Sequence, residues 1–341
     1  ISKKNIRGSY FMIFIGKSPY RVSLLGGGSD LDWFVKDKKY GVCLGYSLDQ
    51  YSYSVLNILP PIAKKGILEY STREEYKNPE EIVHPIVREV LSYFKISNFI
   101  ELKTFGFASG GSGLGGSASF LLSLISALSS AFNLKLSKPE IIEKACFLEI
   151  HRMGKPVGKQ DQYLCASKGF NSYTFFDNNN VEINKISILK KQMLERLSEN
   201  FYLIPTNKKR NSDSVLKDIK NNRESSEKII EIRDIASRFI EFEDQREYKV
   251  EELFNQSVKD SWLIKKNMSQ IMNNTLTEQY KLIDDLIPNN WIRLIGAGNG
   301  GYFLISSKIE EYKIKDLSMK NGIKGIFKAK PSNEGLSNLC I

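Results

Sequence analysis

The sequence predicts an α+β protein built from two domains, residues 11–190 and 200–335. Two observations carry this expectation. The first part of the chain mixes strand-like and helix-like segments, whereas the second part opens with one strand, continues with helical stretches and closes on strands again. The length of 341 residues is consistent with one large or two mid-sized domains, and the hydrophobic fraction of 41% suffices for a core.

In the first domain, short runs rich in β-branched and aromatic residues predict strands at 11–15, 20–25, 41–58, 66–71 and 99–107. Helical spacing predicts helices at 80–94, 117–132 and 138–151. The last of these has good starting signals, with Ser137 as its N-cap and Pro139 in its first turn. A hairpin is expected at 170–186, because the polar run at 177–180 is typical of a turn.

The second domain is predicted to open with a strand at 201–204. Helical stretches follow at 211–222, 224–240, 248–266 and 274–286. Strands at 291–295 and 302–306 then flank a glycine turn, and a helix at 309–320 precedes a last strand at 323–329. No tandem repeat or low-complexity linker interrupts this order.

A glycine-rich segment at 109–119 joins the strand at 99–107 to the apolar helix that follows. Glycine lets the backbone approach an anion, and the first turn of a helix offers unpaired N–H donors and the positive end of its dipole. The segment therefore predicts a phosphate cradle. Its expected phosphate-binding residues are Gly110, Gly111, Ser112, Gly113, Leu114, Gly115, Gly116 and Ser117.

Other interpretations of this segment remain open. Gly111-x-Gly113-x-x-Gly116 matches the dinucleotide fingerprint, which makes an NAD(P)-linked oxidoreductase one alternative. That fingerprint also requires an acidic residue at the end of a strand about twenty residues later. It is missing here, because residues 134–137 are typical of the end of a helix. No lysine follows Gly116, so the segment is not a Walker-type P-loop. A plain glycine turn that packs a helix on a sheet is the third interpretation.

Residues 113–118 of this segment, Gly-Leu-Gly-Gly-Ser-Ala, resemble the central motif of the GHMP kinases, Pro-x-x-x-Gly-Leu-Gly-Ser-Ser-Ala. Gly116 replaces the first serine of that motif, and Ser109 stands near the place of its proline. Residues 17–30 resemble the family's first motif, Pro-Gly-Arg-Val-Asn-Leu-Ile-Gly. Residues 293–301 resemble its third motif, Gly-x-Gly-x-Gly-Gly. The three motifs stand in the family's order and span most of the chain.

The first motif also resembles one branch of that family. It ends in Gly26-Gly27-Gly28-Ser29-Asp30, where galactokinase-like members carry Glu-His. This run and the segment 158–163 are similar to those of the D-glycero-D-manno-heptose 7-phosphate kinases. The resemblance implies a ribosomal-S5-like N-terminal domain and a ferredoxin-like C-terminal domain, with ATP, Mg²⁺ and substrate in the cleft between them. A GHMP kinase for a fucose- or galactose-type sugar is the alternative.

The resemblance also implies roles for individual residues. Asp161, expected in a loop, and Arg21 would be catalytic, and Ser117 and Glu149 would hold the metal. The plainer interpretations are a structural salt bridge for Arg21 and a surface carboxylate for Glu149. The residues expected to bind substrate are Gly27, Gly28, Ser29, Asp30, Lys159, Gln160 and Gly298, with Lys159 a candidate for a distal phosphate.

The composition is consistent with a cytoplasmic enzyme. Four cysteines are scattered without metal-type spacing, and no apolar run is long enough for a membrane span. The net charge of +10 would attract ATP and a sugar phosphate. It would also attract nucleic acid, but no nucleic-acid-binding motif supports that partner. A non-catalytic protein that binds a sugar phosphate is a further alternative, and the sequence does not indicate the oligomeric state.

Overall fold

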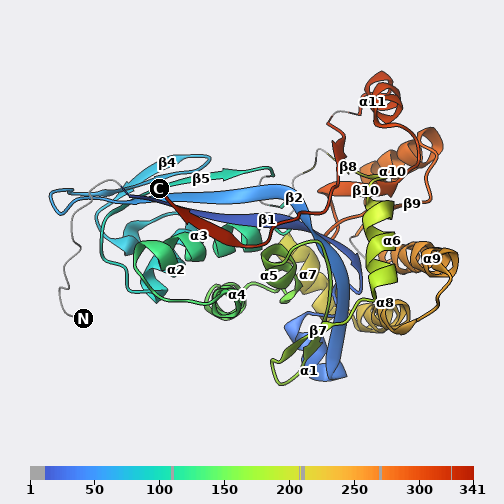
Figure 1. Cartoon of the computed structure of the whole chain (residues 1–341), viewed down its shortest axis with the longest axis horizontal. Helices are drawn as coiled ribbons and strands as arrows, with labels where there is room; N and C mark the ends of the chain where they lie inside the picture. Colours follow the sequence, from blue (N-terminus) through green and yellow to red (C-terminus); the bar gives the residue numbers. More distant parts are fainter. Residues whose placement is uncertain (1–11, 109–110, 207, 209–211, 269–270, 324) are drawn as a thin grey trace.

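A computed structural model describes residues 12–108, 111–206, 208, 212–268, 271–323 and 325–341. Two β-sheets organise this part of the chain, and helices pack against both (Figure 1). The predicted α+β class is confirmed. Among the described helices, none combines the length and the apolar character needed to cross a bilayer.

Two long strands form the centre of the first sheet. β1 (Ile13–Leu25) runs antiparallel to β2 (Tyr40–Ile58). β5 (Ile100–Gly106) pairs with the later half of β2, and β6 (Phe170–Phe176) pairs with its first half. The outer strands are β3 (Gly66–Glu69), β4 (Arg73–Tyr76), β7 (Val181–Asn184) and β12 (Ser337–Cys340).

The strands predicted at 11–15 and 20–25 are one continuous strand, β1. The pairing of β1 with β2 shifts register between Pro19 and Tyr20. Proline has no N–H to donate to a ladder, so an irregularity at this position accommodates it without breaking the strand. The strand therefore carries Arg21 on into the interior of the protein.

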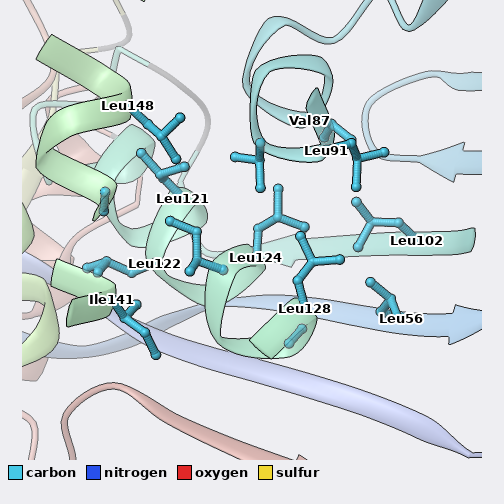
Figure 2. Close-up of a cluster of buried hydrophobic side chains, with 14 of the residues drawn as sticks. Leu56, Val87, Leu91, Leu102, Leu121, Leu122, Leu124, Leu128, Ile141 and Leu148 are labelled. Atoms are coloured by element: carbon cyan, nitrogen blue, oxygen red, sulfur yellow. The ribbon is translucent and has the colours of Figure 1, made fainter. Parts of the chain in front are cut away.

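Helix α3 (Gly116–Ala131) lies on one face of this sheet and forms the largest part of its core. Figure 2 shows Leu124 and Leu128 of α3 beside Leu56 of β2 and Leu102 of β5. Each fully buried leucine contributes about 1.5–3 kcal/mol of transfer free energy. This packing fixes the direction of α3, and with it the position of the glycine segment at its N-terminus.

Other helices surround this core. Those of the first part of the chain are α1 (Asp32–Lys38), α2 (Pro85–Tyr93), α4 (Lys138–Phe147), α5 (Gln160–Ala166) and α6 (Ile188–Ser198). Those of the second part are α7 (Ser212–Asn221), α8 (Arg223–Glu241), α9 (Glu247–Lys266), α10 (Asn274–Leu286) and α11 (Glu311–Lys320).

The second sheet is antiparallel and stands at the other end of the molecule (Figure 1). Its strand order is β11-β8-β10-β9. The four strands are β8 (Phe201–Pro205), β9 (Trp291–Leu294), β10 (Tyr302–Ser306) and β11 (Phe327–Lys328). Buried side chains from α7 to α11 cover it with a second apolar cluster.

Several elements differ from the predictions. The helix expected at 80–94 begins only at Pro85, after a short 3₁₀ turn at Pro79–Glu81. The residue before a proline avoids helical geometry, and His84 is extended with ψ 109°. α1, β4, α5, α6 and β12 were not predicted. Of the strand expected at 323–329, the described residues form only β11, and residue 324 lies outside the described residues.

The chain ends on the first sheet, because β12 pairs with β1 from Phe14 opposite Cys340 to Lys17 opposite Ser337. The division into domains at 11–190 and 200–335 stays a prediction.

Candidate functional site

A cavity of about 730 Å³ brings together residues from both parts of the chain. From the first part it is lined by the inner end of β1, the turn at 26–28, the start of α3 and the start of α5. From the second part it is lined by α7, α8, the end of α9 and the segment after β9. All three motifs that the sequence singled out therefore contribute residues to one cavity.

The centre of the cavity holds a two-pronged ion pair. Arg21 Nε donates to Asp161 Oδ1 at 2.8 Å, and Arg21 Nη2 donates to Asp161 Oδ2 at 2.7 Å. The Arg21 side chain is 6% exposed and that of Asp161 is 27% exposed. Burial alone would lower the pKa of Arg21, but the attraction and hydrogen bond of Asp161 outweigh it and raise that pKa. The guanidinium thus holds Asp161 in one orientation, with the carboxylate facing the cavity.

Asp161 lies in the first turn of helix α5, which corrects the expectation of a loop. The helix is only seven residues long, so its periodicity is weak in the sequence. A carboxylate in a first turn gains from the positive end of the helix dipole. The backbone of Asp161 is therefore part of a helix, which helps to fix the position of its side chain.

Arg21 also holds the glycine segment. Its backbone N–H donates to Leu114 O at 2.9 Å, and its Nη1 donates to Gly113 O at 2.5 Å. Gly115 is the N-cap of α3 in the left-handed conformation, with φ 72°. A Cβ at Gly115 would lie 2.9 Å from Arg21 Cγ, so both backbone conformation and space require glycine here.

Ser117 and Glu149 both line the cavity and are in direct contact with each other. Ser117 Oγ donates to Glu149 Oε1 at 2.5 Å, and Gln162 Nε2 donates to Glu149 Oε2 at 2.6 Å. Glu149 is 4% exposed, which rules out the surface-carboxylate interpretation. Burial raises the pKa of Glu149 to about 7, against the opposing hydrogen bond from Ser117.

A widened helical turn positions Glu149. The backbone of 148–152 makes a bond of the i to i+5 kind, from Met153 N to Leu148 O at 2.9 Å. Such turns occur often at functional sites, because the extra residue redirects neighbouring side chains. Here it follows α4 directly and places Glu149 inside the cavity.

A third group lies where the turn at 26–28 meets α5. Asp30 Oδ2 accepts from Gln160 N at 3.0 Å, and Asp30 Oδ1 accepts from Gln160 Nε2 at 2.7 Å. Ser23 Oγ donates to Gln160 Oε1 at 2.9 Å. Burial raises the pKa of Asp30 to about 6, although the Gln160 bond opposes it. The network orients Gln160, while Asp30 and Gln160 both line the cavity.

Most residues predicted for the site line this cavity. They are Arg21, Gly27, Gly28, Asp30, Gly111, Gly113, Gly115, Gly116, Ser117, Glu149, Gln160 and Asp161. Gly110 lies outside the described residues. Leu114 is buried in a core cluster, and Ser112 is buried with its hydroxyl oxygen accepting from Leu114 N at 3.4 Å.

Three residues predicted to bind substrate lie elsewhere. Ser29 is fully buried, and its hydroxyl lies within hydrogen-bond distance of two carbonyl oxygens, Gly26 O at 2.8 Å and Val42 O at 2.9 Å. Lys159 Nζ contacts Glu143 Oε2 at 3.3 Å and Asn179 O at 3.1 Å, away from the cavity lining. Gly298 packs on Ile271, where a Cβ would come within 2.8 Å of a methyl group.

Several cavity residues were not predicted from the sequence. Lys155 Nζ bonds Asp213 Oδ2 at 2.7 Å, which joins the segment after the widened turn to α7. Lys265, near the end of α9, and Arg293 of β9 also line the cavity. Arg293 begins the third glycine motif, which was the one signal that pointed to it. Lys155, Asp213 and Lys265 belong to no motif.

An aromatic group lines another part of the cavity. The rings of Tyr70 and His84 lie edge to face with centroids 4.7 Å apart, and those of His84 and Phe120 are 5.3 Å apart. Burial lowers the pKa of His84, so its imidazole is neutral near pH 7. Phe120 stands in the first turns of α3, close in sequence to Ser117.

Comparison with known families matches residues 82–169 to the GHMP kinases N terminal domain. That segment contains the glycine-rich loop, Ser117, Glu149 and Asp161. Among characterised proteins, the D-glycero-alpha-D-manno-heptose 7-phosphate kinase of Campylobacter jejuni is 28% identical over 323 residues. The match covers 90% of this chain and 93% of the relative.

Solved structures show the same fold. A D-glycero-D-manno-heptose 1-phosphate kinase from Bacteroides thetaiotaomicron has a TM-score of 0.72 at 18% identity, covering 96% of this chain and 98% of that one. The galactokinase of Lactococcus lactis in complex with galactose has a TM-score of 0.72 at 15% identity, covering 98% and 97%. The predicted GHMP kinase fold is confirmed.

Proposed function

We propose that the chain is a sugar kinase of the GHMP superfamily and that it phosphorylates the anomeric C1 hydroxyl of D-glycero-D-manno-heptose 7-phosphate with ATP. The kinase class replaces the oxidoreductase and non-catalytic alternatives. The observation that carries the proposal is the Arg21–Asp161 pair, which stands beside the N-terminus of α3 in a cavity shared by both parts of the chain.

ATP binding is supported by the start of α3. Gly111, Gly113, Gly115 and Gly116 line the cavity, and the first turn of the helix offers backbone donors to phosphate. The third glycine motif packs on this loop, since a Cβ at Gly301 would lie 2.3 Å from Ser112 O. The aromatic group around Phe120 suits the purine base, which gains from contact with flat apolar faces.

The residues at the start of α3 fit a magnesium ion. Ser117 and Glu149 offer hard oxygen donors in direct contact, and a buried carboxylate gains from a nearby cation. Within the described ranges, no three His, Cys, Asp or Glu side chains gather as a metal site. The other ligands would therefore be phosphate and water oxygens, as Mg²⁺ prefers. Bound there, the ion would neutralise charge on the transferring phosphoryl group.

Asp161 would act on the acceptor. A carboxylate within reach of a hydroxyl can orient it and take its proton. An anomeric hydroxyl is more acidic than an ordinary alcohol, so a carboxylate base suffices. Arg21 keeps Asp161 in place and adds positive charge beside the glycine loop, where negative charge moves during transfer. Asp30 and Gln160 would contact sugar hydroxyls at the neighbouring wall.

An acceptor panel tests the proposal. Purified protein with ATP and Mg²⁺ is assayed against heptose 7-phosphate, heptose 1-phosphate, unphosphorylated heptose, galactose, fucose and mevalonate. The highest kcat/KM is expected for heptose 7-phosphate. Preference for galactose, fucose or mevalonate would refute the heptose assignment and leave the kinase class standing. Preference for heptose 1-phosphate would refute phosphorylation at C1, because the C1 oxygen of that acceptor is already occupied and the phosphate would have to go to another hydroxyl.

A further inference from the structure

Arg293 is a buried cation without an acidic partner in the described part of the chain. It is 3% exposed and lines the cavity. Its Nη1 donates to Leu24 O, and its buried Nε has no hydrogen-bond partner among the residues that the structure describes. Burial lowers the pKa of Arg293 to about 10. A buried charge is normally paired, so a guanidinium without an acidic partner, on a residue that lines the cavity, indicates a place for an anion.

The contacts of Arg293 place it on the acceptor side of the cavity. Leu24 leads directly into the turn at 26–28, and Gly27 of that turn faces Ser23 and Gln160. Gln160 in turn bonds Asp30. Arg293 is therefore linked through one short chain of contacts to the residues proposed to hold the sugar.

A second cation and apolar side chains complete this part of the wall. Lys265 Nζ donates to Gly296 O at 2.7 Å, and Gly296 follows shortly after β9. The neighbouring lining residues from the second part of the chain are mostly apolar: Leu216, Ile219, Ile229, Ile232 and Met268. Apolar surroundings strengthen the attraction between a cation and an anion, because they exclude water.

We propose that Arg293 and Lys265 form the binding subsite for the distal phosphate of the acceptor. This inference rests on the proposed function, because it assumes an acceptor that already carries a phosphate. The Arg293 guanidinium and the Lys265 ammonium would donate charge-assisted hydrogen bonds to the phosphate oxygens. The subsite takes the role that the sequence suggested for Lys159, whose ammonium the structure places at Glu143 instead.

The test compares acceptors with and without the distal phosphate. Arg293→Gln should raise the KM of heptose 7-phosphate by about 10- to 100-fold, the usual range for a hydrogen bond to a charged group. Arg293→Lys should have a smaller effect. For unphosphorylated heptose, kcat/KM should stay within about threefold, and the KM of ATP should not change. Lys265→Gln should repeat the pattern more weakly.

Controls separate this role from a structural one. Arg246→Gln removes one positive charge from an exposed pair with Asp244 outside the cavity and should alter neither acceptor. An equal loss for both acceptors in Arg293→Gln would overturn the proposal, because it would make Arg293 a structural tie to Leu24. A raised KM for ATP alone would overturn it too. The proposal would also be overturned if Lys159→Gln raised the KM of heptose 7-phosphate and Arg293→Gln did not.

A binding measurement needs no turnover and remains informative if Arg293→Gln does not fold. With the glycine loop occupied by ADP, inorganic phosphate should raise the Tm of the wild-type protein. The rise should be smaller in Lys265→Gln and in Arg293→Lys. A phosphate-dependent rise that both variants retain in full would contradict the subsite. If the protein phosphorylated no heptose at all, the proposed function would fail. A phosphate-dependent rise in Tm that is smaller in Lys265→Gln and Arg293→Lys would still support an anion site.

Discussion

Arg21 and Asp161 are 140 residues apart in the chain and form one two-pronged ion pair at the centre of the cavity. The third donor of the guanidinium reaches Gly113 O in the glycine segment. One side chain thus connects the proposed base to the proposed phosphate loop. This arrangement explains why strand β1 runs unbroken into the interior: its inner end delivers the arginine that both elements share.

Asp161→Asn should fold normally and bind ATP, yet transfer phosphate about 10²- to 10⁴-fold more slowly. The amide keeps the size of the carboxylate but cannot accept the hydroxyl proton. Steady-state kcat at saturating acceptor measures the loss, and ADP binding serves as the control for an intact nucleotide site. Wild-type kcat in this variant would mean that another group handles the proton.

Arg21→Ala should lower both kcat and Tm. It leaves Asp161 without its partner, and breaking such a pair costs up to about 3–5 kcal/mol when both charges are buried. Arg21→Lys keeps the positive charge but cannot make both hydrogen bonds to Asp161. Compared with Arg21→Ala, it should therefore restore more of the Tm than of the kcat. In a double-mutant cycle, Arg21→Ala should add little to the kcat loss of Asp161→Asn. Fully additive losses would show that the two residues act independently.

Ser117→Ala should raise the Mg²⁺ concentration for half-maximal rate by about 2- to 10-fold, the value of one ordinary hydrogen bond or ligand contact. The hydroxyl lies 2.5 Å from Glu149 Oε1, so its loss changes the surroundings of that carboxylate directly. Ser130→Ala, at the other end of α3, is the matched control. The same Mg²⁺ dependence in both variants would remove Ser117 from the metal site.

Glu149 should make Mg²⁺ binding depend on pH. Its pKa is raised from 4.5 to about 7, and a cation binds the deprotonated carboxylate. Lowering the pH from about 8 to about 6 should therefore weaken Mg²⁺ binding about tenfold. Asp30, with a pKa of about 6, also titrates here, so Glu149→Gln is the control that isolates the effect. A pH dependence that Glu149→Gln retains in full would assign it to Asp30 or another group.

The same raised pKa has an effect on stability in the metal-free protein. Because the folded state favours the protonated form of Glu149, the stability that this group contributes is fully present below about pH 4.5 and lost as pH rises through about 7. The Tm of the metal-free protein should fall across this window, and less so in Glu149→Gln. An equal fall in the variant would exclude Glu149 as its source.

Local patterns predicted what depends on local sequence. The turn from residue 111 to Gly115, the capped helix after Ser137 and the apolar helix α3 are governed by neighbouring residues, and the structure has all three. The elements that were missed depend on distant partners. β12 has four exposed residues and exists because β1 pairs with it. α5 is too short to show a period, so Asp161 was expected in a loop.

In the candidate site, too, the residues that belong to local motifs were predicted, whereas those placed by distant parts of the chain were not. Motif residues such as Ser117 and Gln160 reach the cavity because their motifs belong to turns and helix starts. Lys159 precedes Gln160 directly, yet its side chain leaves on the other side toward Glu143. Sequence distance cannot resolve that choice, which depends on how α5 is rotated. Arg293 and Lys265 enter from the second part of the chain, so only the assembled fold brings them to the acceptor side.

Phosphorus NMR of the product formed from heptose 7-phosphate, ATP and Mg²⁺ identifies directly which sugar oxygen receives the phosphate. We expect a sugar product with two phosphate signals, of which the new one is coupled to the anomeric proton. That coupling requires a phosphate on the C1 oxygen. A new signal coupled to any other sugar proton, or consumption of ATP without a second phosphate on the sugar, would contradict the account.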